Sequence, residues 1–470
     1  MPRRIAIIGG GCSGTLVAAQ LLREARGPTH VVLIERLHQT GRGVAFGTEC
    51  GDHLLNVPAA RMSAWPDDPD HFLRWARSTP FAANQTIAPG DFLPRQVYGH
   101  YLADVLERAA QGRAGAMVTL ECITGDAIDL EEVEGGGRVS LRDRRIIDAD
   151  SVVLALGNLP GEYPIRRPLP FYHGPRYVHL PWAPGALERI GKLEDILIVG
   201  AGLTAIDIVV KCRAQGHRGV IHALSRRGLR PQVHCNGLPP YAPFLAVGSL
   251  PTTVRTALGR LRKEVRMAAA QGRDWRTVID SIRPVTQALW QGFSWEERAR
   301  FMRHVRPFWE AHRHRIAPAT AAIIHGMEAA GRVKFHAGRL VSLRDSEEGA
   351  AALVKIRRQE DFMALRVAKV INCTGPRTDY SKYQHPLLIN LLAAGLIGHD
   401  PLALGIAALP SGEVLRYNQR PAGWLFTIGA PLKGVLWEST AVPEIRVQAQ
   451  LLAQQIVGRG GAQPCVNPAG

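Results

Sequence analysis

The stretch RIAIIGGGCSGTLVAAQLL, residues 4–22, decides the fold of the N-terminal part of the chain. It starts as an apolar run typical of a buried parallel strand, passes through the pattern Gly9-x-Gly11-x-x-Gly14, and continues with apolar residues at helical spacing. The first glycine permits a tight turn, the second lets the backbone approach a ligand, and the third lets helix and strand pack closely. The stretch therefore predicts the strand, turn and helix that begin a Rossmann-like domain.

A second apolar strand, HVVLIE, follows this helix and ends at Glu35. This acidic residue lies about 20 residues after the last glycine, where a carboxylate accepts hydrogen bonds from ribose hydroxyls. Strand, glycines, helix, strand and acid in this order predict a dinucleotide site with a plain ribose, whose pyrophosphate lies at the helix N-terminus. Gly9, Gly11, Ser13 and Gly14 form its predicted turn.

The same pattern returns in DILIVGAGLTAID, residues 195–207, with Gly200, Gly202, Thr204 and Ala205 in the turn. Its second strand ends in Ser225, Arg226 and Arg227 instead of a carboxylate. Guanidinium groups bind a 2′-phosphate, which a carboxylate would repel, so the second site is predicted to hold NADP. The alternative is that the two arginines only solvate a strand end.

Two adjacent dinucleotide sites suit a protein in which one cofactor reduces the other. NADPH carries a hydride that a flavin accepts, so we predict FAD in the first site and NADPH in the second.

Bulk composition excludes several other classes. At 470 residues the chain is long enough for more than one core, and no apolar run reaches the length of a membrane span, so a cytoplasmic location is expected. The net charge is +16 and the pI about 10.0, yet the basic residues are dispersed, which argues against nucleic-acid binding. The cysteines (Cys12, Cys50, Cys122, Cys212, Cys235, Cys373 and Cys465) form no CxxC pair, which argues against a redox dithiol. No spacing typical of metal ligands is present, and no metal is expected.

These motifs resemble those of the two-dinucleotide-binding-domain flavoproteins, and more narrowly a bacterial FAD/NAD(P)-binding protein family related to class B and N-hydroxylating flavin monooxygenases. The resemblance covers nearly the whole chain. It rests on GRGVAFGT (41–48), HLLNVPAARMS (53–63), VGAGLTAID (199–207), GHRGVIHALSRRG (216–228) and INCTGP (371–376).

The resemblance adds Gly43, Asn56, Met62, Gly157, Gly375 and Gly429 to the candidate cofactor-binding residues, and names no catalytic residue. It also implies that residues 41–110 bring the segment from Asn56 to Ser63 to the flavin. YHGPRYVHLPW (172–182) is similar to a class B monooxygenase fingerprint, with His179 one position late. Arg95 is left open between a substrate contact and a packing role.

The resemblance implies an α/β fold with two Rossmann-like domains, the second inserted in the first. We expect an FAD-binding domain in residues 1–165, an NADP-binding domain in 190–365, and a return to the FAD domain in 366–470. Apolar residues at helical spacing predict a helical insertion of three or four helices at about 250–330. Within it, Arg306, Trp309, His312, Arg313 and Arg315 either shape a pocket for a carboxylate-bearing substrate or balance a helix dipole.

The expected function is an FAD-dependent, NADPH-consuming monooxygenase that acts through a C4a-hydroperoxyflavin, with molecular oxygen, on a small amine, sulfide or carbonyl compound. An anionic substrate is one option, because the chain is basic. Two alternatives stay open: a reductase that passes electrons to a quinone or protein, and a flavin-binding sensor without enzymatic activity. Oligomeric state is also open.

Overall fold

The computed structural model describes residues 2–37, 39–83, 85–111 and 117–459. Cys465, one of the cysteines considered above, lies outside these ranges. The other six cysteines are free thiols. In the described part of the chain, no helix combines the length and the apolar character that crossing a bilayer requires.

The first sheet joins the two ends of the chain. Its order is β15-β16-β7-β1-β2-β3, and all neighbours are parallel except β15 and β16. The strands are β1 (Arg3–Ile8), β2 (Thr29–Glu35), β3 (Val118–Thr124), β7 (Ser151–Leu154), β15 (Glu413–Leu415) and β16 (Pro421–Thr427). Because β15 and β16 come after the whole second sheet in sequence, the second domain is inserted in the first.

Layers of different kinds cover the two faces of the first sheet. One face packs against α1 (Cys12–Glu24), α4 (Arg95–Gln111) and α14 (Val442–Gly458), with α3 (His71–Arg77) and the short α2 (Gly43–Phe46) beside α4. The other face packs against a small antiparallel sheet and one helix. These elements are β4 (Ala127–Val133), β5 (Gly136–Leu141), β6 (Ile146–Ala149) and α12 (Pro386–Ala393).

The second sheet has the order β13-β12-β11-β10-β9-β14-β8. Its parallel part is followed by an antiparallel meander, because the long strand β11 pairs first with β10 and then with β12. The strands are β8 (Tyr177–Val178), β9 (Ile196–Val199), β10 (Ile221–Ser225), β11 (Val333–Ser346), β12 (Gly349–Ile356), β13 (Phe362–Val367) and β14 (Lys369–Asn372). Helices α5 (Leu203–Ala214) and α11 (Pro318–Ala329) pack together on this sheet.

The domain limits expected from the sequence need adjustment at two strands. β14 belongs to the second sheet although it follows residue 365, and β8 joins the same sheet although it precedes residue 190. Both strands pair in parallel at the side of β9 away from β10, which is where the chain passes between the two domains.

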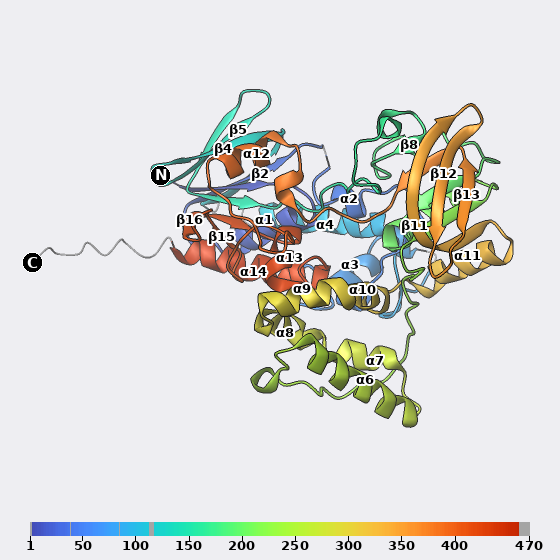
Figure 1. The fold of residues 1–470 in the computed structure, drawn as a ribbon. Coiled ribbons are helices and arrows are strands. Elements are labelled where there is room, and N and C mark those ends of the chain that lie inside the picture. Colours follow the sequence, from blue (N-terminus) through green and yellow to red (C-terminus); the bar gives the residue numbers. More distant parts are fainter. Residues whose placement is uncertain (1, 38, 84, 112–116, 460–470) are drawn as a thin grey trace, which may run out of the picture.

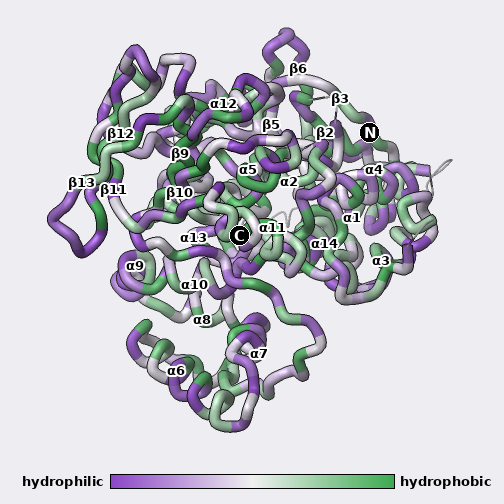
Figure 2. Tube along the Cα trace, turned by 90° about the vertical axis from the view of Figure 1, so that its right-hand side faces the viewer, coloured by the Kyte–Doolittle hydropathy of each residue, from purple (hydrophilic) through white to green (hydrophobic). Residues whose placement is uncertain are grey.

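The helical insertion contains more helices than the sequence indicated. Between residues 254 and 313 lie α6 (Val254–Ala270), α7 (Trp275–Ser281), α8 (Thr286–Gly292), α9 (Trp295–His304) and α10 (Arg306–Arg313). Two stretches that look like single helices are divided, because Pro284 and Pro307 cannot continue the helix before them. The expected limit of 330 also took in α11, which covers the second sheet instead. Helices α6 and α7 project from the rest of the molecule in both views (Figures 1 and 2), and hydrophilic and hydrophobic residues alternate along them in Figure 2.

Candidate functional site

The first glycine turn closes tightly against the neighbouring strand. Gly9 has φ +108°, and its N–H donates to the carbonyl of Ile34 at 2.8 Å. A Cβ atom on Gly9 would lie 2.3 Å from the carbonyl oxygen of Ala155, so only glycine fits. Helix α1 begins after Gly11 without a side-chain cap and without an acidic residue in its first turn. Its N-terminal N–H groups are therefore available to an anion such as a pyrophosphate.

The second turn has the same construction. Gly200 has φ +127° and donates to the carbonyl of Leu224 at 2.7 Å, and a Cβ on it would lie 1.9 Å from the carbonyl oxygen of Cys373. A Cβ on Gly202 would meet nothing within 4 Å, so this turn leaves open space beside its backbone. Helix α5 also starts with no side-chain cap and no acidic first turn.

Two other predicted residues, Gly43 and Gly429, lie at the first turn. A Cβ on Gly43 would lie 3.3 Å from Cα of Gly11, and a Cβ on Gly429 would lie 2.8 Å from Oγ of Ser13. Two segments that are far apart in the sequence therefore meet at the N-terminus of α1. One is the excursion after β2 (residues 41–110), and the other is the return segment (residues 366–470).

Gly157 and Gly375 occupy matching places in the two domains. Gly157 lies two residues after Ala155, whose carbonyl oxygen faces Gly9, and Gly375 lies two residues after Cys373, whose carbonyl oxygen faces Gly200. Both have positive φ, +64° and +90°. A Cβ on either would meet nothing within 4 Å. In the second turn, Thr204 lies half-buried in the first turn of α5, and Ala205 is fully buried.

The two strand ends carry opposite charges, as the sequence predicts. Glu35 at the end of β2 accepts from the N–H of Gly10 at 2.8 Å, so its carboxylate lies at the first turn. After β10, Arg226 is exposed, with no ion pair or hydrogen bond of its side chain in the described residues. Arg227 lies 5.3 Å from the centre of the Phe308 ring on α10. Arg226 is thus the freer of the two for a 2′-phosphate.

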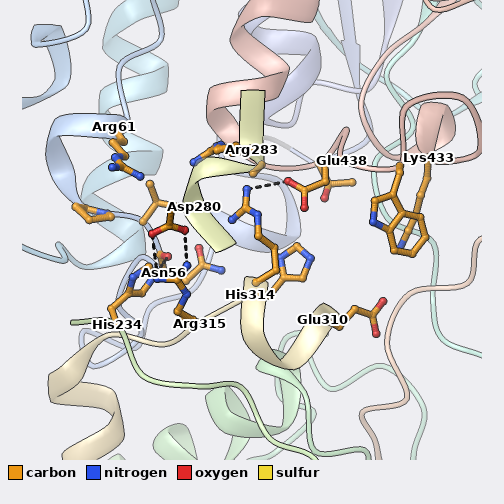
Figure 3. Close-up of a pocket in the computed structure, with 16 residues that line it drawn as sticks. Asn56, Arg61, His234, Asp280, Arg283, Glu310, His314, Arg315, Lys433 and Glu438 are labelled. Carbon is orange, nitrogen blue, oxygen red and sulfur yellow. Dashed lines mark hydrogen bonds and ion pairs between the residues drawn. The ribbon is translucent and has the colours of Figure 1, made fainter. Parts of the chain in front are cut away.

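A pocket lies where the FAD-domain excursion, the helical insertion and the C-terminal return segment meet (Figure 3). The residues that line it are Asn56, Val57, Pro58 and Arg61 from the first domain, His234 after β10, Asp280, Arg283, Glu310, Arg313, His314 and Arg315 from the insertion and the segment after it, and Lys433, Trp437, Glu438, Thr440 and Ala441 from the return segment. Asn56, predicted to contact a cofactor, is one of these lining residues. Helix α14, which packs on α1, begins directly after Ala441.

Most arginines of the pocket are already paired with carboxylates. These pairs are Arg313 with Glu438 at 2.8 Å, Arg283 with Glu444 at 2.8 Å, and Arg315 with Asp280. In contrast, Arg61 and Lys433 form no direct ion pair within the described ranges, and Nζ of Lys433 lies 4.9 Å from the centre of the Trp437 ring. Burial lowers the pKa of Lys433. Glu310 and Glu438 act in the opposite direction on this pKa. Among the charged residues that line the pocket, basic side chains outnumber acidic ones.

Two histidines of the pocket are neutral. Burial lowers the pKa of His314 to about 4, with a further contribution from the neighbouring Arg313. Burial likewise lowers the pKa of His234 to about 4, and its Nε2 donates to the carbonyl of Asn56 at 3.0 Å. His314 makes no ring hydrogen bond to the part of the chain that the structure describes. No group of three or more His, Cys, Asp or Glu side chains in that part is placed to hold a metal ion.

The insertion is fixed to the return segment beside the pocket. Trp290 stacks on Trp437 with 5.0 Å between ring centres, and its Nε1 donates to the carbonyl of Gly434 at 2.8 Å. Trp437 has φ +59° and is the middle residue of a three-residue turn closed by the N–H of Glu438 and the carbonyl of Leu436 at 2.7 Å. Such strained turns persist where surrounding packing holds them, often at ligand sites.

Several sequence-predicted residues lie away from the pocket. Met62 is 2% exposed in the core of the first domain, so its side chain has little surface to offer a cofactor. Arg95 forms an ion pair with Asp207. His179 lies 4.7 Å from the Tyr163 ring and 3.4 Å from the amide nitrogen of Asn372, between the two segments that cross from one domain to the other.

Sequence reasoning missed Arg61, Lys433 and Glu438 as pocket residues. Arg61 lies within the family segment HLLNVPAARMS, and the other two lie within the segment that returns to the FAD domain, so their place in the chain was the available signal. Among the insertion residues singled out, Arg313 and Arg315 line the pocket. Trp309 donates to Glu438, whereas Arg306 and His312 form hydrogen bonds with residues of their own helix.

Two Rossmann-like domains, one inserted in the other, with a polar pocket at their junction, define the two-dinucleotide-binding-domain class of fold. Residues 6–159 match the sequence model of a family described as FAD-NAD(P)-binding. No curated protein sequence matches the chain significantly.

Solved structures with the same overall fold include three enzymes. The ornithine N-hydroxylase of Kutzneria sp. 744 aligns with a TM-score of 0.64 and 14% identity over 98% of this chain and 100% of its own. L-lysine 6-monooxygenase of Pseudomonas syringae gives 0.62 and 14% over 97% and 99%. A cadaverine monooxygenase of Erwinia amylovora, bound to FAD, gives 0.61 and 15% over 100% and 99%. At these identities the likeness establishes the fold.

Proposed function

We propose that the protein is an FAD-dependent, NADPH-consuming oxidoreductase that acts as a monooxygenase on a small amine. The observation that carries the proposal is the pair of glycine turns, the first with Glu35 at the end of its second strand and the second with Arg226 in the corresponding place. A reduced flavin activates molecular oxygen, and the three structural neighbours are named as an ornithine N-hydroxylase, an L-lysine 6-monooxygenase and a cadaverine monooxygenase.

Residues of this chain supply binding and orientation. The N-terminal N–H groups of α1 and α5 hold the two pyrophosphates, Glu35 holds a ribose, and Arg226 holds a 2′-phosphate. The insertion covers the pocket through its contacts with Trp437 and Glu438, which keeps water from the reacting groups.

We further propose that the substrate carries a negative group. Arg61 and Lys433 line the pocket without a direct ion pair in the described residues, and the basic residues of the lining outnumber the acidic ones, so an anion would balance the excess charge. Matched amines with and without a carboxylate, such as lysine and cadaverine, test this. The acidic member should have the lower KM, and Lys433→Gln should raise its KM about tenfold, the loss of one charge-assisted hydrogen bond. Lys382→Gln, on a surface lysine paired with Asp379, is the control. Equal KM values for the two amines would contradict the anionic-substrate proposal.

The test of the reaction is spectroscopic and needs no known substrate. Protein reconstituted with FAD should show flavin absorbance that NADPH bleaches without oxygen, faster than NADH does. On readmission of air in a panel of small amines, NADPH consumption should yield hydroxylated product. Bleaching with reoxidation by a quinone and no oxygenated product would favour a reductase, and absence of bleaching would favour a sensor.

A further inference from the structure

A buried ion pair joins the two dinucleotide-binding domains directly. Arg95, at the start of α4, donates from both terminal nitrogens to the carboxylate of Asp207 on α5, at 2.8 and 2.9 Å. Their side chains are 13% and 8% exposed. A paired, planar fork of this kind fixes direction as well as distance.

His53 completes this contact from the side of the first domain. It is 1% exposed, its Nε2 donates to the main-chain carbonyl of Asp207 at 2.8 Å, and its Nδ1 accepts from the hydroxyl of Thr48 at 2.7 Å. Burial lowers the pKa of His53, so the ring is neutral and this pattern of one donor and one acceptor is the stable one. Trp182, from the segment that crosses between domains, packs edge-on against the His53 ring at 5.6 Å.

The two residues from the first domain also fix each other. The N–H of Arg95 donates to the carbonyl of His53 at 2.8 Å, and its Nε donates to the carbonyl of Leu54 at 3.0 Å. The N–H of Leu55 in turn donates to the carbonyl of Leu93 at 2.8 Å. His53, Arg95 and Asp207 are called the clamp below.

The clamp lies between the two places where the cofactors are proposed to act. Asp207 is four residues after the first residue of α5, roughly 6 Å along the helix from the N-terminus where the second pyrophosphate would lie. On the other side, the segment that begins with His53 continues to Asn56, Val57 and Pro58, which line the pocket. One short backbone segment thus connects the orientation of α5 with the wall of the pocket.

We propose that the clamp positions NADPH relative to the flavin for hydride transfer. In this transfer NADPH gives up a hydride and becomes NADP⁺, and FAD takes up the hydride and one proton to become FADH₂. The inference rests on the proposed function. Arg95, His53 and Asp207 touch neither cofactor in this scheme and are positioning residues. A small displacement between donor and acceptor slows such a transfer strongly, because the reacting atoms must approach closely.

The chain offers a matched control. Arg213 near the end of α5 pairs with Asp52 at 3.5 Å, so a second ion pair joins the same helix to the same excursion. This pair is exposed, 51% and 46%, and exposed pairs constrain geometry weakly.

The first measurement is stopped-flow reduction of the FAD-loaded protein without oxygen. Asp207→Asn and Arg95→Lys should each lower the rate constant of reduction at saturating NADPH at least about tenfold. NADPH affinity should change by less than about threefold, and FAD content and reduction by dithionite should be unchanged. Arg95→Lys retains the charge and loses only the fork, so it keeps the test available if Asp207→Asn folds poorly. Asp52→Asn should match the unaltered protein.

The second measurement needs neither nucleotide nor turnover. Spin labels on the native exposed Cys122 of β3 and on Arg344→Cys of β11 report the distance between the domains, with Cys235→Ser and Cys465→Ser as background. The clamp variants should broaden this distance distribution, and Asp52→Asn should not. If the clamp variants left the distance distribution unchanged, or broadened it while NADPH reduced the flavin at the normal rate, the positioning role would be overturned. If NADPH does not reduce even the unaltered protein, the proposed function fails, whereas the distance measurement still tests the clamp.

Discussion

The two glycine turns share one backbone construction and differ in the side chains at two places. In both, the first glycine has positive φ, donates to the neighbouring strand, and lies against the carbonyl of the strand on its other side. The first turn has glycine at its third position and a carboxylate at its strand end, whereas the second has alanine and arginine. The shared part makes an anion site in each domain, and the differing part determines which dinucleotide each one takes.

The largest expected effect concerns the third position. A Cβ on Gly14 would lie 1.8 Å from the carbonyl oxygen of Gly9, whereas Ala205 carries a fully buried methyl group. Gly14→Ala should therefore lose FAD and lower the melting temperature markedly, at a cost of about 3 kcal/mol or more. Ala205→Gly should cost only about 1 kcal/mol, the helix propensity of glycine. The measurements are the flavin content and the melting temperature of the two variants. If both variants lost similar amounts of stability, the third positions of the two turns would be packed alike.

The next prediction tests whether the open space beside Gly202 is needed for folding or for binding of a ligand. A Cβ on Gly202 meets no protein atom within 4 Å, so Gly202→Ala should leave the melting temperature and the flavin content unchanged. The added methyl group lies where a pyrophosphate would approach the backbone. Affinity for NADP⁺, measured by calorimetry, should fall at least about tenfold, roughly 1.4 kcal/mol. Unchanged affinity would mean that no dinucleotide binds at this turn.

Local patterns allowed both turns and both Rossmann-like domains to be predicted from the sequence. Each motif lies within about 30 residues, so the turn, its helix and its second strand specify one another. Local patterns did not indicate Gly43 and Gly429. These two residues became candidates only through the family resemblance, because no local rule links residues so far apart in the sequence.

The pocket could be predicted only in part, because its charge balance depends on ion pairs between residues that are far apart in the sequence. Arg313 and Arg315 were candidates for a carboxylate of the substrate, but acidic residues from other elements already pair with them. Lys433, with no special motif around it, lines the pocket without a direct ion pair in the described residues. Arg95 shows the same limitation: its partner Asp207 lies in the other domain, and sequence spacing gives no indication of that contact.

The strand ends give two further predictions. Arg226→Ala should weaken NADPH binding by about 1.5–3 kcal/mol, roughly 10- to 150-fold, and leave NADH binding unchanged, because only the 2′-phosphate differs. Arg218→Ala, an exposed arginine before the same strand, is the control. Equal losses for the two nucleotides would assign Arg226 to general electrostatic attraction.

The smallest expected effect is at the other strand end. Glu35 accepts from the N–H groups of Gly10 and Leu37, so Glu35→Gln keeps its shape and one accepting oxygen but removes the charge. Hydrogen bonds to a charged acceptor exceed neutral ones by about 1 kcal/mol, so affinity for FAD should fall roughly fivefold. Flavin titration of the apoprotein measures this change. Because a ribose hydroxyl is neutral, the loss should not depend on salt, whereas the effect of Arg226→Ala should shrink as salt screens the phosphate charge. A salt-dependent loss at Glu35 would show that its charge balances the helix and the pyrophosphate rather than holding a ribose.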